Sequence, residues 1–211
     1  MSEPALKMAK DALRERLRTR RAALDAAWTE EAGAQIDERL LDLPEVRAAH
    51  VLMGYLAVPG EVRVDAVLRA AEAAGIRVCV PAAHGTPREY DPAWLPADEG
   101  LRAAAWGIRE PACPEWVAAD TAIDVVLVPG VAFDAHGGRL GHGKGYYDGL
   151  LARLGARARC RIGVAFGFQL VEAVPCGPRD VRMDAVVVEA RVYRPAAVST
   201  TGANEVTQCG L

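Results

Sequence analysis

Three cations and three glycines share one short stretch of the chain, Arg139–Gly145. Glycine occupies every second position from Gly141 to Gly145, and Lys144 lies between the last two. Glycine adopts positive φ readily, and without a Cβ its backbone N–H groups can approach an anion closely. With Arg139 and His142 nearby, the stretch has the composition of a site for phosphate or another anion. The alternative interpretation is a glycine-rich surface turn.

The elements that flank this loop favour the first interpretation. Val125–Val128 is an uninterrupted apolar run that ends at a Pro-Gly pair, which predicts a buried strand. Tyr146–Leu154 predicts a helix whose free N–H groups and positive dipole end open onto the loop. The loop is not a Walker A motif, because neither serine nor threonine follows the lysine, and it lacks the GxGxxG dinucleotide pattern. A strand, a glycine-rich loop and a helix start in this order are typical of polyphosphate binding.

One carboxylate accompanies these cations. Asp148 is the only acidic residue between Asp134 and Glu172, and it lies in the first turn of the predicted helix. A carboxylate beside phosphate oxygens is a common ligand of Mg²⁺. We therefore interpret Asp148 as a candidate metal ligand.

Apolar strands and helices take turns along the rest of the chain. This alternation predicts an α/β fold of three layers, an open and mostly parallel sheet with helices on both faces, preceded by a long N-terminal helix. Ligands bind such sheets at the carboxyl ends of the strands. We expect one domain over residues 1–195 and a disordered tail over 196–211, which is polar and aperiodic. The expected helices are Pro4–Trp28, Thr29–Leu43 and Val62–Ala74, and the further strands are His50–Ala57, Ile76–Val80, Arg161–Phe166 and Ala185–Glu189.

Composition limits the class of protein. A chain of 211 residues, of which 51% are hydrophobic, can bury one good core. The net charge of −3 provides no global attraction to nucleic acid or to an acidic membrane, and no apolar run approaches the roughly 20 residues of a membrane span. The five cysteines are scattered and form no CxxC pattern, which argues against a disulfide framework and a zinc site. We expect a cytoplasmic protein that is a monomer or a weak dimer.

The first predicted helix carries a basic stripe beside its apolar stripe. One interpretation is a solvated basic face, and another is that one or two of these cations reach a phosphate site. A third is an interaction protein that binds nucleic acid through the stripe. The basic positions are Lys7, Lys10, Arg14, Arg18 and Arg21.

Phe133–Asp148, with the sequence FDAHGGRLGHGKGYYD, resembles the signature of the 5-formyltetrahydrofolate cyclo-ligase family. Lys10–Arg14 (KDALR) matches the KxxLR at the start of that family, and the resemblance extends to Glu189. It implies a ligase that cyclises 5-formyltetrahydrofolate to 5,10-methenyltetrahydrofolate. The implied reaction uses ATP and Mg²⁺, phosphorylates the formyl oxygen, and releases ADP and phosphate.

The resemblance also implies the nucleotide site. We assign Lys144 and Arg139 to the transferring phosphate as the catalytic residues, while Arg18 and Arg21 are expected to stay on the solvated face. The implied ATP-binding residues are Lys10, Arg14, Arg139, Leu140, Gly141, His142, Gly143, Lys144, Gly145, Tyr146 and Tyr147.

The implied folate-binding residues are Leu56, Glu61, Trp106, His142 and Tyr146. Glu61 follows a Pro-Gly turn, and a carboxylate there can accept paired hydrogen bonds from the amino group and ring N–H of a pterin. Taken alone, Glu61 is equally explained as a solvent-exposed loop acid or as a charge in the first turn of a helix.

For the metal, the resemblance implies Asp148 and Asp180. Asp180 follows Arg179 where the family has a His-Asp pair, and taken alone it is explained as a loop acid that pairs with Arg179 or Arg182. This departure, together with Arg63, leaves an alternative function: a divergent family member that binds nucleotide or folate without turnover.

Overall fold

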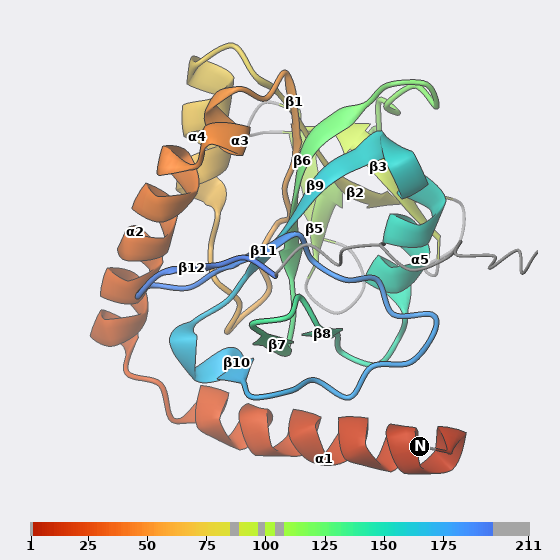
Figure 1. Cartoon of the computed structure of the whole chain (residues 1–211). Helices are drawn as coiled ribbons and strands as arrows, with labels where there is room; N and C mark the ends of the chain where they lie inside the picture. The colour runs from red at the N-terminus through yellow and green to blue at the C-terminus, as the bar shows by residue number, and fades with distance from the viewer. Residues whose placement is uncertain (1, 85–88, 97–99, 104–107, 196–211) are drawn as a thin grey trace, which may run out of the picture.

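The computed structural model describes residues 2–84, 89–96, 100–103 and 108–195. Its centre is a seven-stranded sheet with the order β12-β11-β9-β6-β1-β2-β3 (Figure 1). The strands from β11 to β2 pair in parallel, whereas the edge strands β12 and β3 pair antiparallel with their neighbours. In chain order these strands are β1 (Val51–Met53), β2 (Arg77–Ala83), β3 (Tyr90–Trp94), β6 (Ile123–Pro129), β9 (Ala158–Val164), β11 (Ala185–Val187) and β12 (Val192–Tyr193).

Strand β6 lies at the centre of this sheet and is apolar on both faces. Val125 and Leu127 pack into one core, and Val126 and Val128 pack into the other. All four side chains have no exposed surface. A parallel strand covered by helices on both faces needs apolar residues at every position. The prediction of a buried strand at Val125–Val128 is therefore confirmed.

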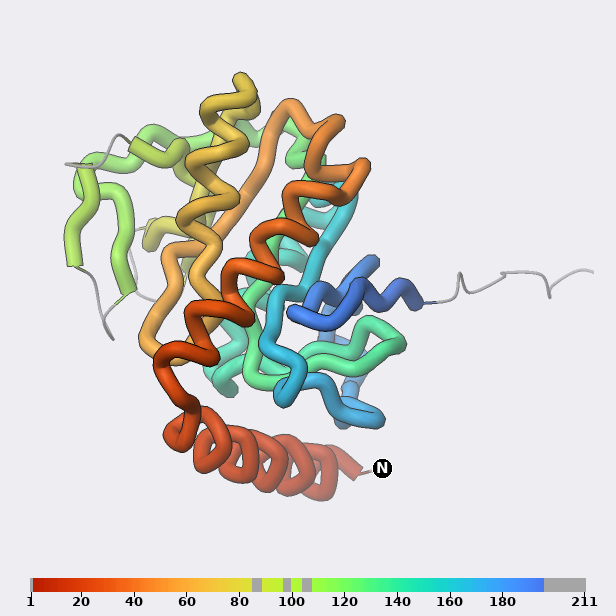
Figure 2. The backbone as a smooth tube through the Cα atoms, turned by 90° about the vertical axis from the view of Figure 1, so that its left-hand side faces the viewer, coloured from red at the N-terminus to blue at the C-terminus, as the bar shows by residue number. Residues whose placement is uncertain are grey.

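Helices cover both faces of the sheet. Helices α2 (Ala26–Asp42), α3 (Pro44–Arg47) and α4 (Asp65–Ala73) lie on one face, and α5 (Tyr146–Leu154) lies on the other. Figure 2 shows α2 and α4 side by side. The predicted three-layer α/β architecture is confirmed, and α5 has the predicted bounds. Two short 3-10 turns, η3 (Gly155–Arg157) and η4 (Gly167–Gln169), flank β9.

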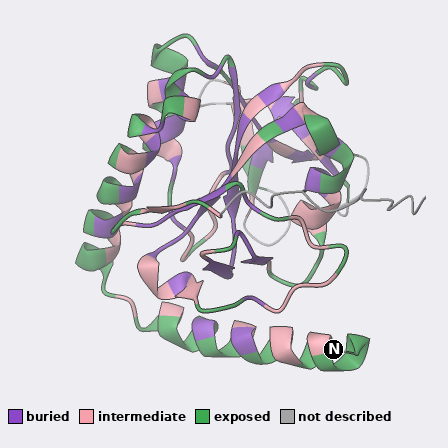
Figure 3. Ribbon diagram, in the orientation of Figure 1, coloured by how far each residue is buried: buried purple, intermediate pink, exposed green. Residues whose placement is uncertain are grey.

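Helix α1 (Glu3–Ala22) runs past the end of the sheet at which β6 finishes (Figure 1). Its Leu13 and Leu17 pack against Ala132 and Leu140 of a small sheet with the order β10-β7-β8. Leu13 and Leu17 are the buried residues of α1, whereas most of the helix is exposed (Figure 3). Among the described helices, none combines the length and the apolar character that crossing a bilayer requires. The strands of the small sheet are β7 (Ala132–Asp134), β8 (Arg139–Leu140) and β10 (Leu170–Val171).

The prediction of one helix over Pro4–Trp28 was wrong, because α1 ends at Ala22 and α2 begins at Ala26. Asp25 is the N-cap of α2, and its carboxylate accepts a hydrogen bond of 2.9 Å from the Trp28 N–H. The predicted N-cap of the second helix, Thr29, lies inside α2 instead. Since α1 crosses the strand ends and α2 covers a face of the sheet, the chain must turn between them.

The other predicted strands exist with different bounds. Of the predicted strand His50–Ala57, only Val51–Met53 forms a strand. The predicted strand Ile76–Val80 is longer in the structure and spans Arg77–Ala83. That strand continues through Pro81 because Pro81 lies opposite Pro92 in an antiparallel pair, at a position that needs no backbone donor. A hairpin of β4 (Leu101–Ala103) and β5 (Arg109–Pro111) was not predicted. The predicted tail, 196–211, lies outside the described residues.

Neighbouring strands β1 and β6 send the chain to opposite faces of the sheet. The chain leaves β1 for α4 on the first face, and it leaves β6, by way of β7 and β8, for α5 on the second. Such divergence opens a crevice at the carboxyl edge of a parallel sheet. The loops that border it are residues 54–64 and 141–145.

Buried Asp134 holds the chain that follows β6. Its Oδ1 accepts hydrogen bonds of 2.8 Å from the N–H groups of His136 and Gly138, and its Oδ2 accepts one of 2.8 Å from Val174. These bonds form the turn between β7 and β8 and tie it to a segment 40 residues later. The position of Arg139, directly after this turn, depends on them.

We expect Asp134→Ala to lower the free energy of unfolding by at least about 2 kcal/mol, because two buried N–H groups, those of Gly138 and Val174, lose their acceptor at about 1–3 kcal/mol each. Urea unfolding followed by circular dichroism measures the difference. Exposed Asp120 provides the control, and its replacement by alanine should change stability by no more than about 0.5 kcal/mol. Equal stability of the two variants would contradict this role of Asp134.

Candidate functional site

The glycine-rich loop lies between β8 and α5 at the carboxyl edge of the sheet. Gly143 and Gly145 have φ of +94° and +74°, and Gly145 is the N-cap of α5. Gly141 is needed for a different reason, since a Cβ there would lie 3.1 Å from Nη1 of Arg139. The loop thus combines two positions that favour glycine for its backbone freedom with one where a side chain would press on the Arg139 guanidinium.

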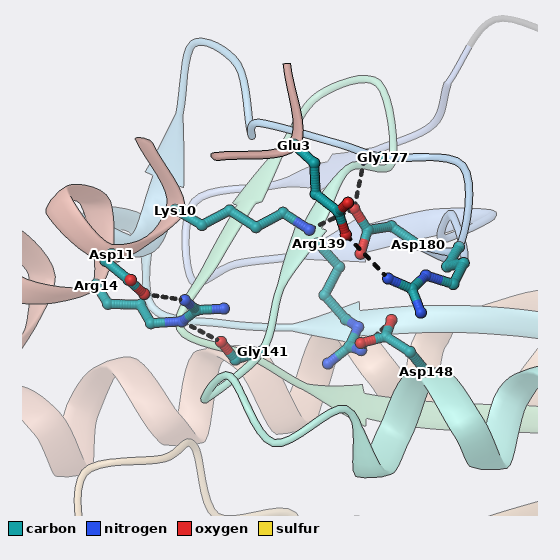
Figure 4. Close-up of polar contacts among 10 residues, drawn as sticks. Glu3, Lys10, Asp11, Arg14, Arg139, Gly141, Asp148, Gly177 and Asp180 are labelled. Carbon is teal, nitrogen blue, oxygen red and sulfur yellow. Dashed lines mark hydrogen bonds and ion pairs between the residues drawn. The ribbon is translucent and has the colours of Figure 1, made fainter. Parts of the chain in front are cut away.

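A charged groove of about 750 Å³ opens on one side of this loop. Its walls come from α1, from the loop with the start of α5, and from the segment that precedes β11 (Figure 4). A groove with this many cations and backbone amides is suited to a polyanion. The lining includes Lys10, Arg14, Arg139, Gly141, Gly143, Lys144, Gly145, Asp148, Arg179 and Asp180.

Lys10 and Asp180 form an ion pair of 2.6 Å across the groove. The Asp180 carboxylate also accepts a hydrogen bond of 2.6 Å from the Gly177 N–H. Burial by itself would raise the pKa of Asp180, but these two hydrogen bonds and the charge of Lys10 outweigh it and hold the pKa below its ordinary value. Asp180 therefore pairs with a residue of α1 and not with Arg179 or Arg182, the partners expected for an ordinary loop acid.

Arg139 and Asp148 form a second ion pair, of 2.7 Å. The Arg139 side chain is only 2% exposed and also donates a hydrogen bond to the Pro129 carbonyl. Its Nε is buried without a hydrogen-bond partner among the described residues. A buried guanidinium with an unused donor is uncommon unless a ligand or water satisfies it.

Arg14 joins α1 directly to the glycine-rich loop. Its Nε donates a hydrogen bond of 3.0 Å to the Gly141 carbonyl, and its Nη1 pairs with Asp11 at 2.6 Å. Figure 4 shows Lys10 and Arg14 turned from α1 toward the groove. These two cations are therefore not part of a solvated face, whereas Arg18 is, because it is 64% exposed and pairs only with exposed Glu15.

The two candidate metal ligands come from different walls of the groove, Asp148 from the start of α5 and Asp180 from the segment that precedes β11. Asp148 and Asp180 each hold one cation of the groove, and no group of three or more metal-binding side chains occurs in the described part of the chain. Two carboxylates cannot complete the oxygen shell of Mg²⁺ by themselves, but phosphate oxygens and waters can supply the remainder. The residues therefore fit a magnesium ion that arrives with a polyphosphate better than a resident one.

A second cavity, the aromatic crevice, lies on the other side of the loop. It has a volume of about 130 Å³ and fills the divergence between β1 and β6. The rings of Tyr90 and Tyr146 meet there at 5.4 Å and 54°, while burial raises the pKa of Tyr55 and Tyr147, so both stay protonated at neutral pH. Its lining includes Tyr55, Leu56, Val58, Glu61, Tyr90, Ile108, Arg109, Pro129, His142, Tyr146 and Tyr147.

Glu61 is the acidic residue of this crevice. Its side chain is 8% exposed, its Oε2 accepts a hydrogen bond of 3.1 Å from the Val58 N–H, and its Oε1 lies 3.2 Å from Nε2 of His142. Tyr55 supports the same loop by donating a hydrogen bond to the Val62 carbonyl at 2.7 Å. Glu61 is therefore neither a solvent-exposed loop acid nor a helix charge, because α4 begins four residues later at Asp65.

The glycine-rich loop is a wall of both cavities. A narrow passage of about 70 Å³ is lined by crevice residues, among them Glu61 and Tyr146, and by groove residues, among them Lys144 and Asp148. A molecule in the crevice and a phosphate in the groove can therefore meet beside Lys144. Two reactants held in contact in this way react far faster than they would in solution.

The structure brings together most of the residues predicted for the site. Leu140 borders the groove, and its side chain is 1% exposed and packs against α1. Trp106 lies outside the described residues, so its predicted contact with the substrate stays a prediction. Leu56 borders the crevice, and its predicted contact with the folate stays a prediction.

Sequence reasoning missed Tyr90, Pro129 and Arg21. Arg21 was expected on the solvated face, but its side chain packs under Gly60, where a Cβ would lie 2.5 Å from its Cδ. Burial lowers its pKa from the ordinary arginine value. The signal was available, because Arg21 follows Arg14 by seven residues and so lies on the same side of the helix.

Comparisons with known proteins agree with this geometry. The model of the 5-formyltetrahydrofolate cyclo-ligase family matches residues 6–189. The chain is 31% identical over 184 residues to the 5-formyltetrahydrofolate cyclo-ligase of Escherichia coli K12, covering 84% of this chain and 98% of that protein. It is 28% identical over 196 residues to a probable 5-formyltetrahydrofolate cyclo-ligase of Caenorhabditis elegans, covering 88% of this chain and 95% of that protein. The solved structure of Aquifex aeolicus 5,10-methenyltetrahydrofolate synthetase superposes with a TM-score of 0.76 at 29% identity, covering 93% of this chain and 98% of that one.

The Lys10–Asp180 ion pair should contribute to the free energy of unfolding in a way that depends on pH. An aspartate with a lowered folded pKa contributes stability that is present above the ordinary carboxyl pKa of about 3.9 and is lost as the pH falls through the folded value. We expect Lys10→Met to cost about 2 kcal/mol of unfolding free energy at pH 7, and the difference from wild type to shrink below about pH 4. Urea unfolding at pH 7 and pH 3 measures both.

Arg18→Met is the matched control, since it removes an exposed ion pair of the same helix and should change stability by about 0.5 kcal/mol or less. A Lys10→Met effect that is the same at both pH values would show that the ion pair is not its cause.

Proposed function

Because the chain belongs to the 5-formyltetrahydrofolate cyclo-ligase family, we propose that it cyclises 5-formyltetrahydrofolate to 5,10-methenyltetrahydrofolate in a reaction that consumes ATP. The observation that carries this proposal is the position of the glycine-rich loop. It borders a polycationic groove on one side and an aromatic crevice on the other, with a passage between them. A reaction that transfers phosphate to an aromatic-ring substrate needs this arrangement of two adjoining cavities.

The charged groove is proposed to hold the ATP phosphates. Lys144, Arg139 and the amides of the glycine-rich loop would surround the transferring phosphate, beside the N-terminus of α5. The unused Nε of Arg139 supports this role. Lys10 and Arg14 would contact the rest of the polyphosphate from α1.

The two ion pairs of the groove support a role in charge compensation. Without nucleotide, Asp180 and Asp148 neutralise Lys10 and Arg139. A polyphosphate would take over these cations and leave the two carboxylates available to Mg²⁺. When bound, the magnesium ion would supply further positive charge at the phosphates and fix their orientation.

The aromatic crevice is proposed to hold the pterin. Glu61 would accept hydrogen bonds from the pterin amino group and ring N–H, which are directional and strengthened by its charge. Leu56 and Tyr146 would contact the faces and edges of the ring. His142, now within hydrogen-bond distance of Glu61, would move aside or contact the substrate.

In the proposed reaction the formyl oxygen attacks the γ-phosphorus of ATP, and ADP leaves. The N-10 nitrogen of the folate then attacks the activated formyl carbon, the phosphate departs with the formyl oxygen, and N-10 loses its proton. This sequence requires no protein nucleophile. It requires positioning and neutralisation of charge, which the groove and the crevice can provide.

The first functional prediction concerns the groove. Lys144→Ala and Asp148→Asn should each lower kcat about 100-fold or more, because each removes a group that stabilises or places the transferring phosphate. The absorbance of the methenyl product, recorded with Mg-ATP and 5-formyltetrahydrofolate, measures the rate. Lys7→Ala, an exposed lysine of α1, should keep the wild-type rate.

Wild-type rates in both groove variants would refute the site assignment. A wild-type protein that binds ATP and the folate tightly yet forms no methenyl product would instead support the alternative, a family member without this turnover.

The second functional prediction concerns the crevice. Glu61→Gln should raise the KM for 5-formyltetrahydrofolate about tenfold or more, since the amide replaces an accepting oxygen by a donor that opposes the donors of the pterin. The KM for ATP should change less than about twofold. Steady-state kinetics with each substrate varied in turn separates the two effects. Glu72→Gln, on the exposed side of α4, is the control, and a rise in the KM for ATP equal to that for the folate would contradict the assignment.

A further inference from the structure

The aromatic crevice is too small for a complete folate. Its volume of about 130 Å³ suits a fused ring, whereas cavities for whole ligands of this size measure about 300–1,000 Å³. The benzoyl group and the acidic glutamate tail must therefore continue beyond it. The passage beside Lys144 adjoins the charged groove, which the proposed function reserves for ATP.

A wide groove of about 1,000 Å³ also adjoins the crevice. This groove, called here the tail groove, lies between the α1–α2 junction and the loop that follows β1. It shares Val58, Glu61 and Arg109 with the aromatic crevice. A substrate with its pterin beside Glu61 can thus extend into the tail groove without crossing the nucleotide site.

Two guanidinium groups at the mouth of the tail groove share a single carboxylate. Arg63 and Arg109 pair with Asp65 at 3.3 Å and 3.1 Å. Their side chains are 79% and 44% exposed, so both can turn toward a ligand. One positive charge at this position is left without a counter-charge from Asp65.

Arg21 supplies a third cation deeper in the tail groove. Its side chain lies under Gly60, and its Nη2 is buried with no hydrogen-bond partner among the described residues. Arg21 also lies close enough to Glu61 for their charges to interact. It therefore places positive charge at the junction of the tail groove and the crevice.

The opposite wall, on α2, carries two acids. Glu30 is exposed, and Asp37 is partly buried, so that desolvation and the nearby charge of Asp65 raise its pKa to about 6. These carboxylates repel an acidic ligand. They direct it toward the arginine side of the groove, where the loop after β1 and strand β5 lie.

We propose that the tail groove binds the glutamate tail of the folate substrate, with Arg63 and Arg109 contacting its carboxylates and Arg21 adding positive charge where the tail leaves the crevice. This inference rests on the proposed function, because only a folate-type substrate brings such a tail. Guanidinium groups bind carboxylates through paired hydrogen bonds, and each additional glutamate adds a carboxylate within reach of the groove.

The test uses three substrates that differ only in the tail: 5-formyltetrahydropteroate, which has no glutamate, and the mono- and triglutamate forms of 5-formyltetrahydrofolate. For the wild type we expect the KM to fall as glutamates are added. In the double variant Arg63→Gln, Arg109→Gln the KM for the triglutamate should rise about 4- to 25-fold, because each exposed charge pair that is lost raises it about two- to fivefold. Because Arg109 also borders the crevice, the KM for the substrate without glutamate should rise by less than that for the triglutamate, and in Arg63→Gln alone, which lies outside the crevice, it should stay within about twofold.

Arg159→Gln is the matched control, since Arg159 is a 64% exposed arginine paired with one aspartate at the opposite, amino edge of the sheet. A binding measurement makes the test independent of turnover: calorimetric titration with p-aminobenzoyl-triglutamate should detect binding to the wild type and the control, and binding weakened at least fivefold in the double variant.

A wild-type KM that does not depend on tail length, or a double variant whose KM rises equally for all three substrates, would overturn the proposal. Failure of the triglutamate probe to bind the wild type, or equal binding to the double variant, would also overturn it. If no substrate is cyclised but the probe binds and loses affinity in the double variant, the proposed function fails and the tail groove is supported. If all three substrates are cyclised with equal KM, the proposed function is supported and the proposed role of the tail groove fails.

Discussion

Strands β1 and β6 are hydrogen-bonded neighbours whose chains leave for opposite faces of the sheet, and both cavities of the site depend on that divergence. The strands themselves are held by the apolar contacts of β6 in two cores. At the carboxyl edge those contacts end, and the chain has to satisfy its backbone groups with turns and side chains. Asp134, Tyr55 and Glu61 do so for the loops on either side. The positions of the functional side chains thus follow from how these loops are closed.

Electrostatics explains why a groove with so many cations is stable without a ligand. Two cations of the groove that are largely shielded from solvent are each paired with a carboxylate, Lys10 with Asp180 and Arg139 with Asp148. Unpaired charges in such partly buried positions would cost several kcal/mol. In the proposed reaction the same carboxylates serve the metal that accompanies the nucleotide. One set of residues would therefore balance charge both with and without substrate.

The candidate site was predictable to different degrees. The glycine-rich loop, its cations and α5 are contiguous in the chain, so local composition and spacing were sufficient to predict them. The boundary between α1 and α2 was not, because alanine-rich sequence favours helix on both sides of Asp25, and only the need to cover the sheet face ends the first helix. For Arg21 the helical spacing from Arg14 indicated the side of the helix, but its burial depends on Gly60, which lies 39 positions later and contacts it only in the folded chain.

The amino-acid sequence by itself determined the alternation of strands and helices, the buried character of Val125–Val128, and the anion-binding composition of Arg139–Gly145, since each is a property of neighbouring residues. The tertiary structure alone decided which charges meet. Lys10 contacts Asp180, which lies 170 positions away in the sequence, and His142 contacts Glu61, which lies 81 positions away. Pairings of this kind depend on the order of strands in the sheet and on the path of α1 past their ends, which arise from packing of the whole core and leave no local pattern in the chain.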